Sequence, residues 1–431
     1  MGTQKANRKL LLEDGQEYVG VGFGAESSRV CEIVFNTSMV GYQEILSDPS
    51  YTDQAVVMTY PLIGNYGMAA EDYETARPTM GALIVREYND VPSNFRSVET
   101  LDSVMKRYGI PGIQGVDTRM LARSIRDHGS RKVLLADASV SREEGLRILR
   151  ETQLPHDAVA RVSCRGIQIC EAAAAGYPGK DGAGYAAGVE MGYAAGVGTG
   201  YVAGVETRYA AGVETGYVAG VETRYVAGVG TGYVAGVGTG YAAGVEMGKK
   251  VVAIDCGMKE NIVRSFHQRG VTVIRVPWNT TAEEIRALRP DGIFLSNGPG
   301  DPTDVPETIQ TVQDLIGCRP IFGICLGHQI LSLAYGARTY KLKFGHRGGN
   351  HPVKDLETGK IEITSQNHSY AVDGASLEGT RLTPTHINLL DQTIEGVKCE
   401  KDGVYSVQYH PESAPGPQDS RYLFDRFCAL L

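Results

Sequence analysis

An eight-residue repeat occupies the middle of this chain and limits how the rest can be organised. From Gly184 to Met247, tyrosines recur at positions 185, 193, 201, 209, 217, 225, 233 and 241, in units such as Gly-Tyr-Val-Ala-Gly-Val-Glu-Thr. The tract contains no Leu, Ile, Phe or Pro, so it lacks most of the large apolar residues of an ordinary hydrophobic core. The 431 residues must therefore form separate domains on either side of it, over 1–165 and 249–431, joined through 166–248.

Two interpretations of the repeats are open. Tyr and Thr or Met fall on odd positions while Gly and Glu fall on even ones, an alternation that permits β structure. Ordering one octad costs roughly 8–16 kcal/mol of conformational entropy. Burying its one Tyr, one Val and smaller residues returns roughly 5–8 kcal/mol. We therefore expect a flexible linker, and a stacked β arrangement is the alternative.

Charge and cysteine content exclude several functional classes. Lys and Arg number 42 against 50 Asp and Glu, and a net charge of −8 argues against a dedicated nucleic-acid-binding protein. No apolar run reaches about 18 residues, so we expect no membrane span, and the polar N-terminus does not resemble a signal peptide. Eight scattered cysteines without a Cys-x-x-Cys pair indicate reduced thiols in a cytoplasmic protein, with no disulfide framework and no zinc site.

The two flanking segments differ in pattern. Residues 1–165 combine short β-like runs, at 30–35 and 54–59, with a helix expected over 117–128 that Gly129 ends, so we predict a mixed β/α domain. Residues 249–431 alternate strand and helix, which predicts a doubly wound α/β domain. The expected strands cover 251–254, 271–276, 293–295, 320–324 and 403–409, and the expected helices cover 259–269 and 280–288. A capping box formed by Thr280 and Glu283 is predicted to open the second helix.

The sharpest chemical signal surrounds Cys325. A short apolar strand leads into this cysteine, a helical pattern follows directly, and glycines flank it at 323 and 327. This is the pattern of a nucleophile elbow, with Cys in place of Ser. The helix N-terminus favours a thiolate, and the following N–H can face a developing oxyanion. The alternative is a buried core cysteine beside a strand.

A thiol with an unperturbed pKa near 8.5 needs a basic partner to react at neutral pH. Among the nine histidines, His410 is the best candidate, because it ends a strand-like run and Glu412 follows two residues later. Residues at the carboxyl ends of parallel strands face the crevice where open α/β sheets bind ligands. Glu412 can orient the imidazole and stabilise its cation. The alternative is an ordinary surface histidine near a turn.

The other motifs carry weaker signals. The glycines of Ser-Asn-Gly298-Pro-Gly300 form either a plain βα turn or a set of bare N–H groups at the sheet edge of Cys325. His346, His351 and His368 are expected in polar, Gly-rich loops, without metal-ligand spacing on a helix. Neither a phosphate-binding Gly-Lys-Ser/Thr loop nor a complete dinucleotide fingerprint occurs, so we expect no nucleotide, metal or other cofactor in this chain.

Taken together, three motifs resemble the class I (triad) glutamine amidotransferases. They are Gly-Ile-Cys325-Leu-Gly-His-Gln, Ser-Asn-Gly298-Pro-Gly300-Asp-Pro and His410-Pro-Glu412. Further segments are similar to the small chain of glutamine-hydrolysing carbamoyl-phosphate synthetase, and they cover 41–51, 59–67, 112–119 and 344–353. The resemblance extends over roughly 8–165 and 249–431, and its N-terminal motifs are specific to that small chain.

This resemblance implies a glutaminase with a Cys325–His410–Glu412 triad, in which Cys325 attacks the carboxamide, His410 carries the proton and Glu412 orients His410. The implied oxyanion hole uses the N–H groups of Gly298 and Leu326. The implied glutamine contacts are Ser50, Gly300, Gln329, Asn367, Ser369 and Tyr370. Ser369 stands where the resembled family has Gly, which would alter the site if that position required a positive φ.

The resemblance also implies a partner. The ammonia would pass to a large chain that holds ATP and Mg²⁺ and makes carbamoyl phosphate from bicarbonate, for either arginine or pyrimidine biosynthesis. Two rival classes are open. The N-terminal motifs argue against the first, an amidotransferase of another synthase or a γ-glutamyl hydrolase. The intact triad argues against the second, a non-enzymatic scaffold built on the repeats.

Deleting Gly184–Met247 is expected to leave folding and glutamine hydrolysis nearly unchanged, because every candidate site residue lies outside the repeats. Shortening the linker alters loop-closure entropy only logarithmically, by about 1 kcal/mol or less. Thermal unfolding and glutamine turnover of the deleted and full-length chains measure the effect. A fall in Tm of more than about 10 °C would instead indicate that the repeats pack on the domains as ordered β structure.

Overall fold

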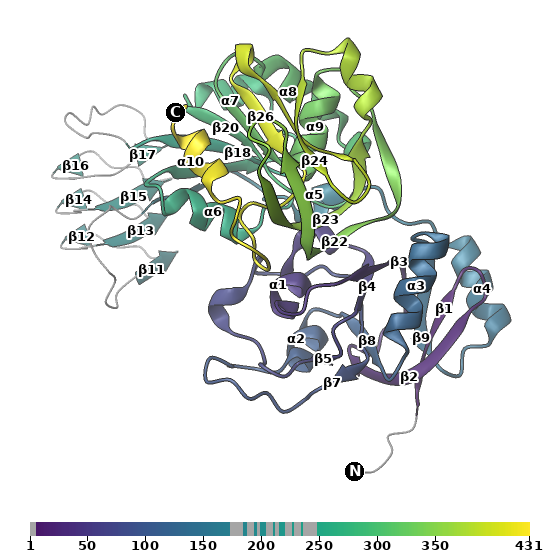
Figure 1. Ribbon diagram of the computed structural model, residues 1–431. Helices are drawn as coiled ribbons and strands as arrows, with labels where there is room; N and C mark the ends of the chain where they lie inside the picture. The colour runs from purple at the N-terminus through teal and green to yellow at the C-terminus, as the bar shows by residue number, and fades with distance from the viewer. Residues whose placement is uncertain are drawn as a thin grey trace. The chain divides into compact units, whose positions relative to one another are not determined.

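The structure is a computed structural model (Figure 1). It describes residues 6–172 and 248–431 and, between them, only the backbone of seven short strands. Most of the repeat tract, on which the flexible-linker prediction falls, lies outside the described residues. The two flanking domains belong to one compact unit, and Ala172–Lys249 with Gly270–Thr272 belong to a second.

A closed barrel forms the N-terminal domain. In order around the barrel its strands are β1 (Arg8–Leu12), β2 (Glu17–Gly24), β8 (Pro111–Gln114), β6 (Ala82–Ile84), β4 (Gln54–Met58), β3 (Arg29–Asn36) and β9 (Lys132–Asp137). Neighbours pair in both senses: β1 and β2 are antiparallel, whereas β3 and β4 are parallel. The helices of this region are α1 (Tyr42–Ser47), α2 (Leu101–Arg107), α3 (Thr118–His128), α4 (Arg142–Glu151) and α5 (Ala158–Val162). The predicted mixed β/α domain is confirmed.

Helix α3 follows its local signals. The side chain of Asp117 accepts the N–H of Met120 at 2.9 Å, which satisfies one of the free donors of the first turn. Gly129, with φ 92°, follows the last helical residue and donates its N–H to the carbonyl of Ile125 at 2.7 Å. The predicted helix and its end are therefore confirmed.

A ten-stranded sheet forms the second domain. Its parallel centre consists of β18 (Lys250–Asp255), β20 (Gly292–Leu295), β21 (Ile321–Ile324) and β26 (Val404–Val407). The flanking strands are β10 (Gln168–Cys170), β19 (Thr272–Pro277), β25 (Ile394–Cys399), β23 (Ile361–Val372), β22 (Thr339–Asp355) and β24 (Thr383–Asn388). Residues 168–170, expected in the linker, form β10 because they pair with β19 in antiparallel register.

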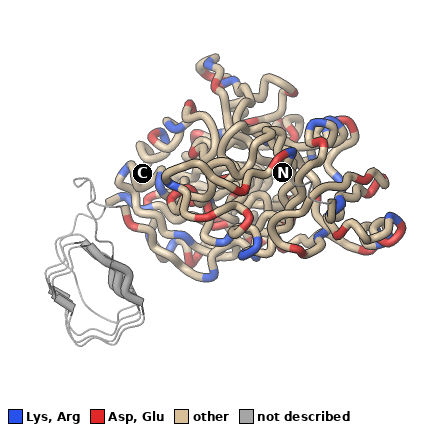
Figure 2. Tube along the Cα trace, turned by 90° about the horizontal axis from the view of Figure 1, so that it is seen from below, with Lys and Arg blue, Asp and Glu red and all other residues tan. Residues whose placement is uncertain are grey.

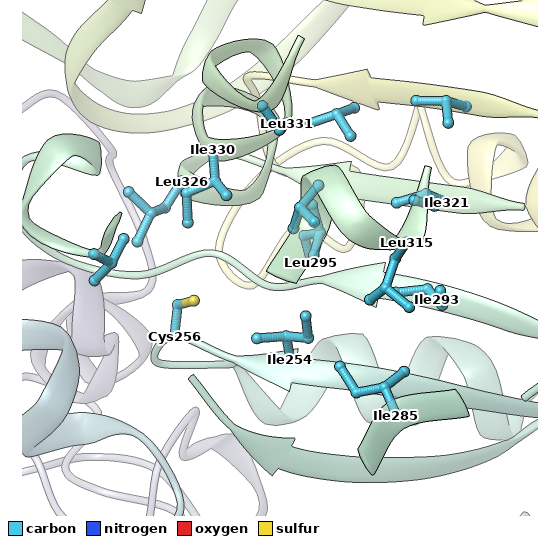
Figure 3. Close-up of a cluster of buried hydrophobic side chains, with 14 of the residues drawn as sticks. Ile254, Cys256, Ile285, Ile293, Leu295, Leu315, Ile321, Leu326, Ile330 and Leu331 are labelled. Atoms are coloured by element: carbon cyan, nitrogen blue, oxygen red, sulfur yellow. The ribbon is translucent and has the colours of Figure 1, made fainter. Parts of the chain in front are cut away.

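Helices cover both faces of this sheet, as a doubly wound fold requires. Successive residues of a strand point to opposite faces, so Ile293 and Leu295 lie on one side of β20 and Phe294 on the other. The first side packs against α7 (Ala282–Ala287), α8 (Pro306–Leu315) and α9 (Leu326–Ala334), as Figure 3 shows. On the second side Phe294 meets Phe266 of α6 (Glu260–His267) edge to face, with ring centroids 5.2 Å apart, and Phe266 also meets Phe424 of α10 (Tyr422–Cys428).

The capping box of α7 lies one residue later than predicted. Thr281 Oγ1 accepts the N–H of Glu284 at 3.3 Å, and the Glu284 carboxylate accepts the N–H of Thr281 at 2.9 Å. Thr280 instead donates its hydroxyl to the carbonyl of Pro277 at 2.8 Å, so this side chain belongs to the turn that leaves β19.

Within the repeats the backbone of seven strands forms two parallel sheets. One contains β11 (Gly184–Ala187), β13 (Thr199–Ala203), β15 (Thr215–Ala219) and β17 (Val234–Ala235), and the other contains β12 (Ala194–Ala195), β14 (Ala210–Ala211) and β16 (Val226–Ala227). Paired positions such as 201 and 217 are 217 − 201 = 16 residues apart, which is two octads. Alternate octads therefore contribute to the same sheet, and the flexible-linker interpretation of the whole tract stays a prediction.

Three further observations bear on the expected class of protein. In the view of Figure 2, basic and acidic positions are interspersed along the described chain. No helix in 6–172 or 248–431 is both long and apolar enough to cross a membrane. All eight cysteines are free thiols, as their irregular spacing predicts.

The two flanking domains meet at the N-terminus of α6. Glu74 of the N-terminal domain is buried there, and its carboxylate accepts the N–H of Asn261 at 3.0 Å and Nη1 of Arg264 at 3.3 Å. Its carbonyl accepts the N–H of Glu260 at 3.0 Å. Burial raises the pKa of Glu74 to about 7, although the neighbouring Lys259 and Arg264 oppose this shift.

Glu74→Gln is expected to change how stability depends on pH. The folded chain holds the Glu74 proton up to a pKa of about 7, and the unfolded chain releases it near the ordinary value of 4.5. The contribution of Glu74 to the free energy of unfolding is therefore fully present below pH 4.5 and is lost as pH rises through 7. The Tm of the natural chain should fall relative to Glu74→Gln across this window, equivalent to roughly 3 kcal/mol in total. A constant Tm difference from pH 4.5 to 8 would contradict the raised pKa.

Candidate active site

Cys325 lies in the sharp turn between β21 and α9. Its φ of 54° and ψ of −105° are unfavourable for a residue that carries a side chain. Its N–H donates to the carbonyl of Val407 on the neighbouring strand at 2.9 Å, and its carbonyl accepts the N–H of Gln329 at 3.2 Å. The side chain is 2% exposed, and its Sγ lies 3.5 Å from the carbonyl oxygen of Asn367. The predicted strand, turn and helix are all present.

The flanking glycines are required by close backbone approach. A Cβ on Gly323 would lie 2.8 Å from the carbonyl oxygen of Gly327, and one on Gly327 would lie 2.2 Å from that of Leu295. Both distances are shorter than any relaxed contact with backbone atoms. The Gly-x-Cys-x-Gly pattern therefore lets α9 begin directly against β20 and β21.

His410 and Glu412 follow β26, the strand beside β21. His410 Nδ1 lies 2.7 Å from Glu412 Oε1, and both side chains are buried. His410 Nε2 forms no hydrogen bond to any part of the chain that the structure describes. Burial alone would lower the pKa of His410, but the negative charges of Glu412 and Cys325 outweigh it and raise the pKa to about 10. The imidazolium is therefore the favoured form of this pair.

Lys259 is a site residue that the sequence analysis missed. Its Nζ lies 3.0 Å from Glu412 Oε1 and donates to the carbonyl of Ser413 at 2.6 Å, and the side chain is buried. Burial raises the pKa of Glu412, but the cations of Lys259 and His410 lower it to about 2. Glu412 is thus ionised between two cations. The available sequence signal was its place just after strand 251–254, at the same sheet edge as Cys325.

A cavity of about 200 Å³ opens beside Cys325. The six residues expected to contact glutamine line it together with Gly298 of the implied oxyanion hole, and the six are Ser50, Gly300, Gln329, Asn367, Ser369 and Tyr370. The side chain of Leu326 packs in the hydrophobic core instead. The structure thus brings the sequence-predicted contacts to one place, with residues of both domains around it.

Asp48 accepts hydrogen bonds from residues on both sides of the cavity. Its Oδ1 accepts the N–H of Ser50 at 2.9 Å, and its Oδ2 accepts Nδ2 of Asn367 at 3.0 Å. Asn297 Nδ2 donates to the Ser50 hydroxyl at 3.0 Å. Because Asp48 and Ser50 belong to the N-terminal domain and the asparagines to the second, the wall of the cavity is complete only where the domains meet.

Gly298 and Leu326 can offer backbone N–H groups near the nucleophile. Leu326 is the first residue of α9, where the N–H has no carbonyl partner within the helix. A Cβ on Gly298 would lie 2.2 Å from the carbonyl oxygen of Cys256 and 2.8 Å from Leu326 Cδ2, so this approach requires glycine. Two such donors are the usual composition of an oxyanion hole.

Ser369 occupies its position without backbone strain. It lies within β23 and is not among the described non-glycine residues with positive φ. Its departure from Gly therefore does not force an unfavourable backbone conformation at this position.

The three histidines expected in loops lie in strands instead. His346 and His351 belong to β22 and His368 to β23. The two strands pair across their glycine-rich stretch with irregular register between Lys341 and His346 and again between Gly348 and His351. These bulges let a sequence that resembles a loop stay within the sheet.

His346, His368 and Glu395 have one ligand atom each within 4.8 Å of the others, a spacing that could hold a metal ion. Hydrogen bonds engage part of this group, because His346 Nε2 lies 2.8 Å from Asp391 Oδ2 and His368 Nε2 lies 2.6 Å from Gln366 Oε1. His346 Nδ1, 3.6 Å from Glu395 Oε1, has no hydrogen-bond partner within the described residues. Glu395 accepts Nε2 of Gln366 at 2.9 Å. The residues form a hydrogen-bonded network, and the absence of a metal stays a prediction.

Each of the two domains matches a known protein family. Residues 252–430 match the family described as glutamine amidotransferase class-I, and residues 10–135 match carbamoyl-phosphate synthase small chain, CPSase domain. The chain is 44% identical over 421 residues to the carbamoyl phosphate synthase small chain of Fusobacterium nucleatum, covering 98% of this chain and 97% of that one. It is 43% identical over 424 residues to the pyrimidine-specific small chain of Bacillus subtilis, covering 98% and 96%.

A solved structure of a glutamine amidotransferase from Thermotoga maritima is also similar. The match covers 39% of this chain and 77% of that one, with 18% sequence identity and a TM-score of 0.32. This likeness is too weak to bear on activity. The match over 10–135 reaches outside the amidotransferase domain and disfavours the amidotransferase of another synthase. The chain belongs to the carbamoyl phosphate synthase small chain family.

Proposed function

We propose that this chain hydrolyses L-glutamine at Cys325, with His410 as the proton carrier and Glu412 as the residue that orients it. The observation that carries the proposal is the placement of Cys325 on a strained turn at a cavity, next to the strand that bears the buried His410–Glu412 pair. Such an arrangement supplies a nucleophile, a base and the group that holds the base.

The reaction begins from Cys325 as the thiolate, with its proton already held on His410 Nε2, as the raised pKa of His410 favours. This ring nitrogen has no other partner within the described residues, and Nδ1 is held by Glu412. The sulfur then attacks the side-chain carboxamide carbon of glutamine. The raised pKa of His410 keeps the imidazolium in place until the leaving nitrogen needs a proton.

The oxygen of the carboxamide becomes negative as the carbon–sulfur bond forms, and the N–H groups of Leu326 and Gly298 stabilise it. His410 returns its proton to the amide nitrogen, the carbon–nitrogen bond breaks, and ammonia leaves a γ-glutamyl thioester on Cys325. A water then gives a proton to His410 while its oxygen attacks the thioester. The carbon–sulfur bond breaks, the new γ-carboxyl group releases its proton to solvent, and glutamate leaves Cys325 as the thiolate beside the protonated His410.

Substrate binding is assigned to Ser50, Gly300, Gln329, Asn367, Ser369 and Tyr370. Gln329 illustrates the preorganisation, because its Nε2 donates to the carbonyl of Tyr370 at 2.8 Å and to Gln408 Oε1 at 2.9 Å. These bonds leave the amide oxygen of Gln329 to accept from a ligand. Preorganised groups of this kind lower the entropic cost of orienting the substrate.

The ammonia is delivered to a large partner chain that uses ATP and Mg²⁺ to make carbamoyl phosphate from bicarbonate. Membership of the small chain family supports this part of the proposal. No cofactor is assigned to the small chain itself. A cytoplasmic location is part of the same proposal and is supported by the eight free cysteines.

Cys325→Ala is expected to abolish glutamine hydrolysis, since no covalent route to the thioester remains. The loss should exceed the roughly 10²–10³-fold effect of removing one oxyanion donor. Assembled with its large chain, the variant should retain carbamoyl phosphate synthesis from added ammonia, which serves as the control for folding and assembly. Substantial residual glutaminase activity would refute the role of Cys325.

His410→Asn is expected to lower glutamine turnover by about 10²–10⁴-fold, the usual contribution of general acid–base catalysis. His328→Asn is the matched control. His328 is equally buried, but its Nδ1 lies 2.9 Å from the Ser406 hydroxyl, and burial lowers its pKa to about 3, so it does not carry protons at neutral pH. Equal losses in the two variants would mean that the base has been misassigned.

A further inference from the structure

Arg347 is a buried cation in the wall of the cavity beside Cys325. It lies in β22, lines the cavity and is only 3% exposed. Its Nη1 donates to the carbonyl of Phe344 at 2.8 Å, and its Nη2 donates to the hydroxyl of Ser369. Its Nε has no partner, and no carboxylate within the described ranges forms an ion pair with it.

A buried charge without a counterion is costly, so its presence calls for an explanation. Burial lowers the pKa of Arg347, yet a guanidinium stays charged at any physiological pH. The other permanent cation of the cavity wall, Lys341, already pairs with Glu32 at 2.5 Å. Arg347 is therefore the permanent cation of the wall that forms no ion pair within the described residues, although the charges of Glu32 and Cys325 also act on it.

The hydroxyl of Ser369 connects this cation to the cavity. Ser369 also lines the cavity, and its oxygen accepts the proton of Arg347 Nη2. Its own hydroxyl proton is then free for a second acceptor, and the positive charge behind it strengthens that donation.

We propose that Arg347, acting through the hydroxyl of Ser369, recognises the α-carboxylate of glutamine and so selects substrates that carry this charge. The inference rests on the proposed glutaminase function and adds a specificity determinant to it. Ser369 touches the substrate, and Arg347 is the positioning residue behind it. The α-carboxylate supplies the anion that the buried guanidinium lacks.

The test compares L-glutamine with L-glutaminamide, in which a neutral carboxamide replaces the α-carboxylate. The full chain is assayed with each compound as substrate, and glutaminamide is also used as a competitor of glutamine. Arg347→Met should lower kcat/KM for glutamine by about 10–100-fold, mainly through KM, because charge-assisted hydrogen bonds are lost. Turnover and inhibition constants for glutaminamide should change by less than about threefold.

Ser369→Ala keeps the cation but removes the connecting hydroxyl. It should therefore also lower the ratio of kcat/KM for glutamine to kcat/KM for glutaminamide, by a smaller factor than Arg347→Met. Arg338→Met is the matched control, since Arg338 is an exposed arginine of the same domain that pairs with Asp373 at 2.9 Å, and both substrates should be unaffected. If Arg347→Met does not fold by circular dichroism, the ratio measured for Ser369→Ala decides the question.

Equal losses for glutamine and glutaminamide would assign Arg347 a purely structural role and overturn the inference. Unchanged kinetics with glutamine would overturn it as well. A natural chain that does not hydrolyse glutamine, alone or with its large chain, would instead refute the proposed function, and the inference would fall with it. If the natural chain is active but Arg347→Met leaves the ratio of kcat/KM for glutamine to kcat/KM for glutaminamide unchanged, this inference alone is refuted.

Discussion

A row of alternating buried charges holds the catalytic region together. Glu412 lies between His410 at 2.7 Å and Lys259 at 3.0 Å, so its carboxylate is compensated on both sides. An uncompensated ion at this depth would cost several kcal/mol. Because Lys259 directly precedes α6 and Glu412 follows β26, the contact that keeps Glu412 ionised also holds this helix against the sheet. Glu74 of the N-terminal domain contacts the same helix through Asn261 and Arg264.

The features that could be predicted from the sequence are those whose causes are local. Glycines two residues before and after Cys325 predict the turn because the strand and the helix that it joins are adjacent in the sequence. Asp117 and Gly129 mark α3 because capping involves neighbours within a few residues. The alternation of strands and helices over 249–431 likewise indicated a doubly wound sheet, since each element must bury one apolar face.

The features that were missed or misplaced depend on distant parts of the chain. Lys259 acquires its role only when Glu412, from the other end of the domain, lies beside it. His346 and His368 read as loop residues because their glycines and polar side chains suit a loop, and only pairing of β22 with β23 makes them part of a sheet. Arg347 forms no ion pair because no carboxylate from elsewhere in the described chain reaches it, and a local sequence pattern cannot predict that.

The cavity formed by both domains bears on how such a chain can evolve. Asp48 and Ser50 meet Asn297 and Asn367 across the domain boundary. Recombination that exchanged only the amidotransferase domain could keep a Cys–His–Glu triad. It would lose the hydrogen bonds across the boundary unless the new domain also carried asparagines that reach Asp48 and Ser50. We therefore expect the two domains to be inherited together, and substitutions at the boundary in one domain to be constrained by the residues they contact in the other.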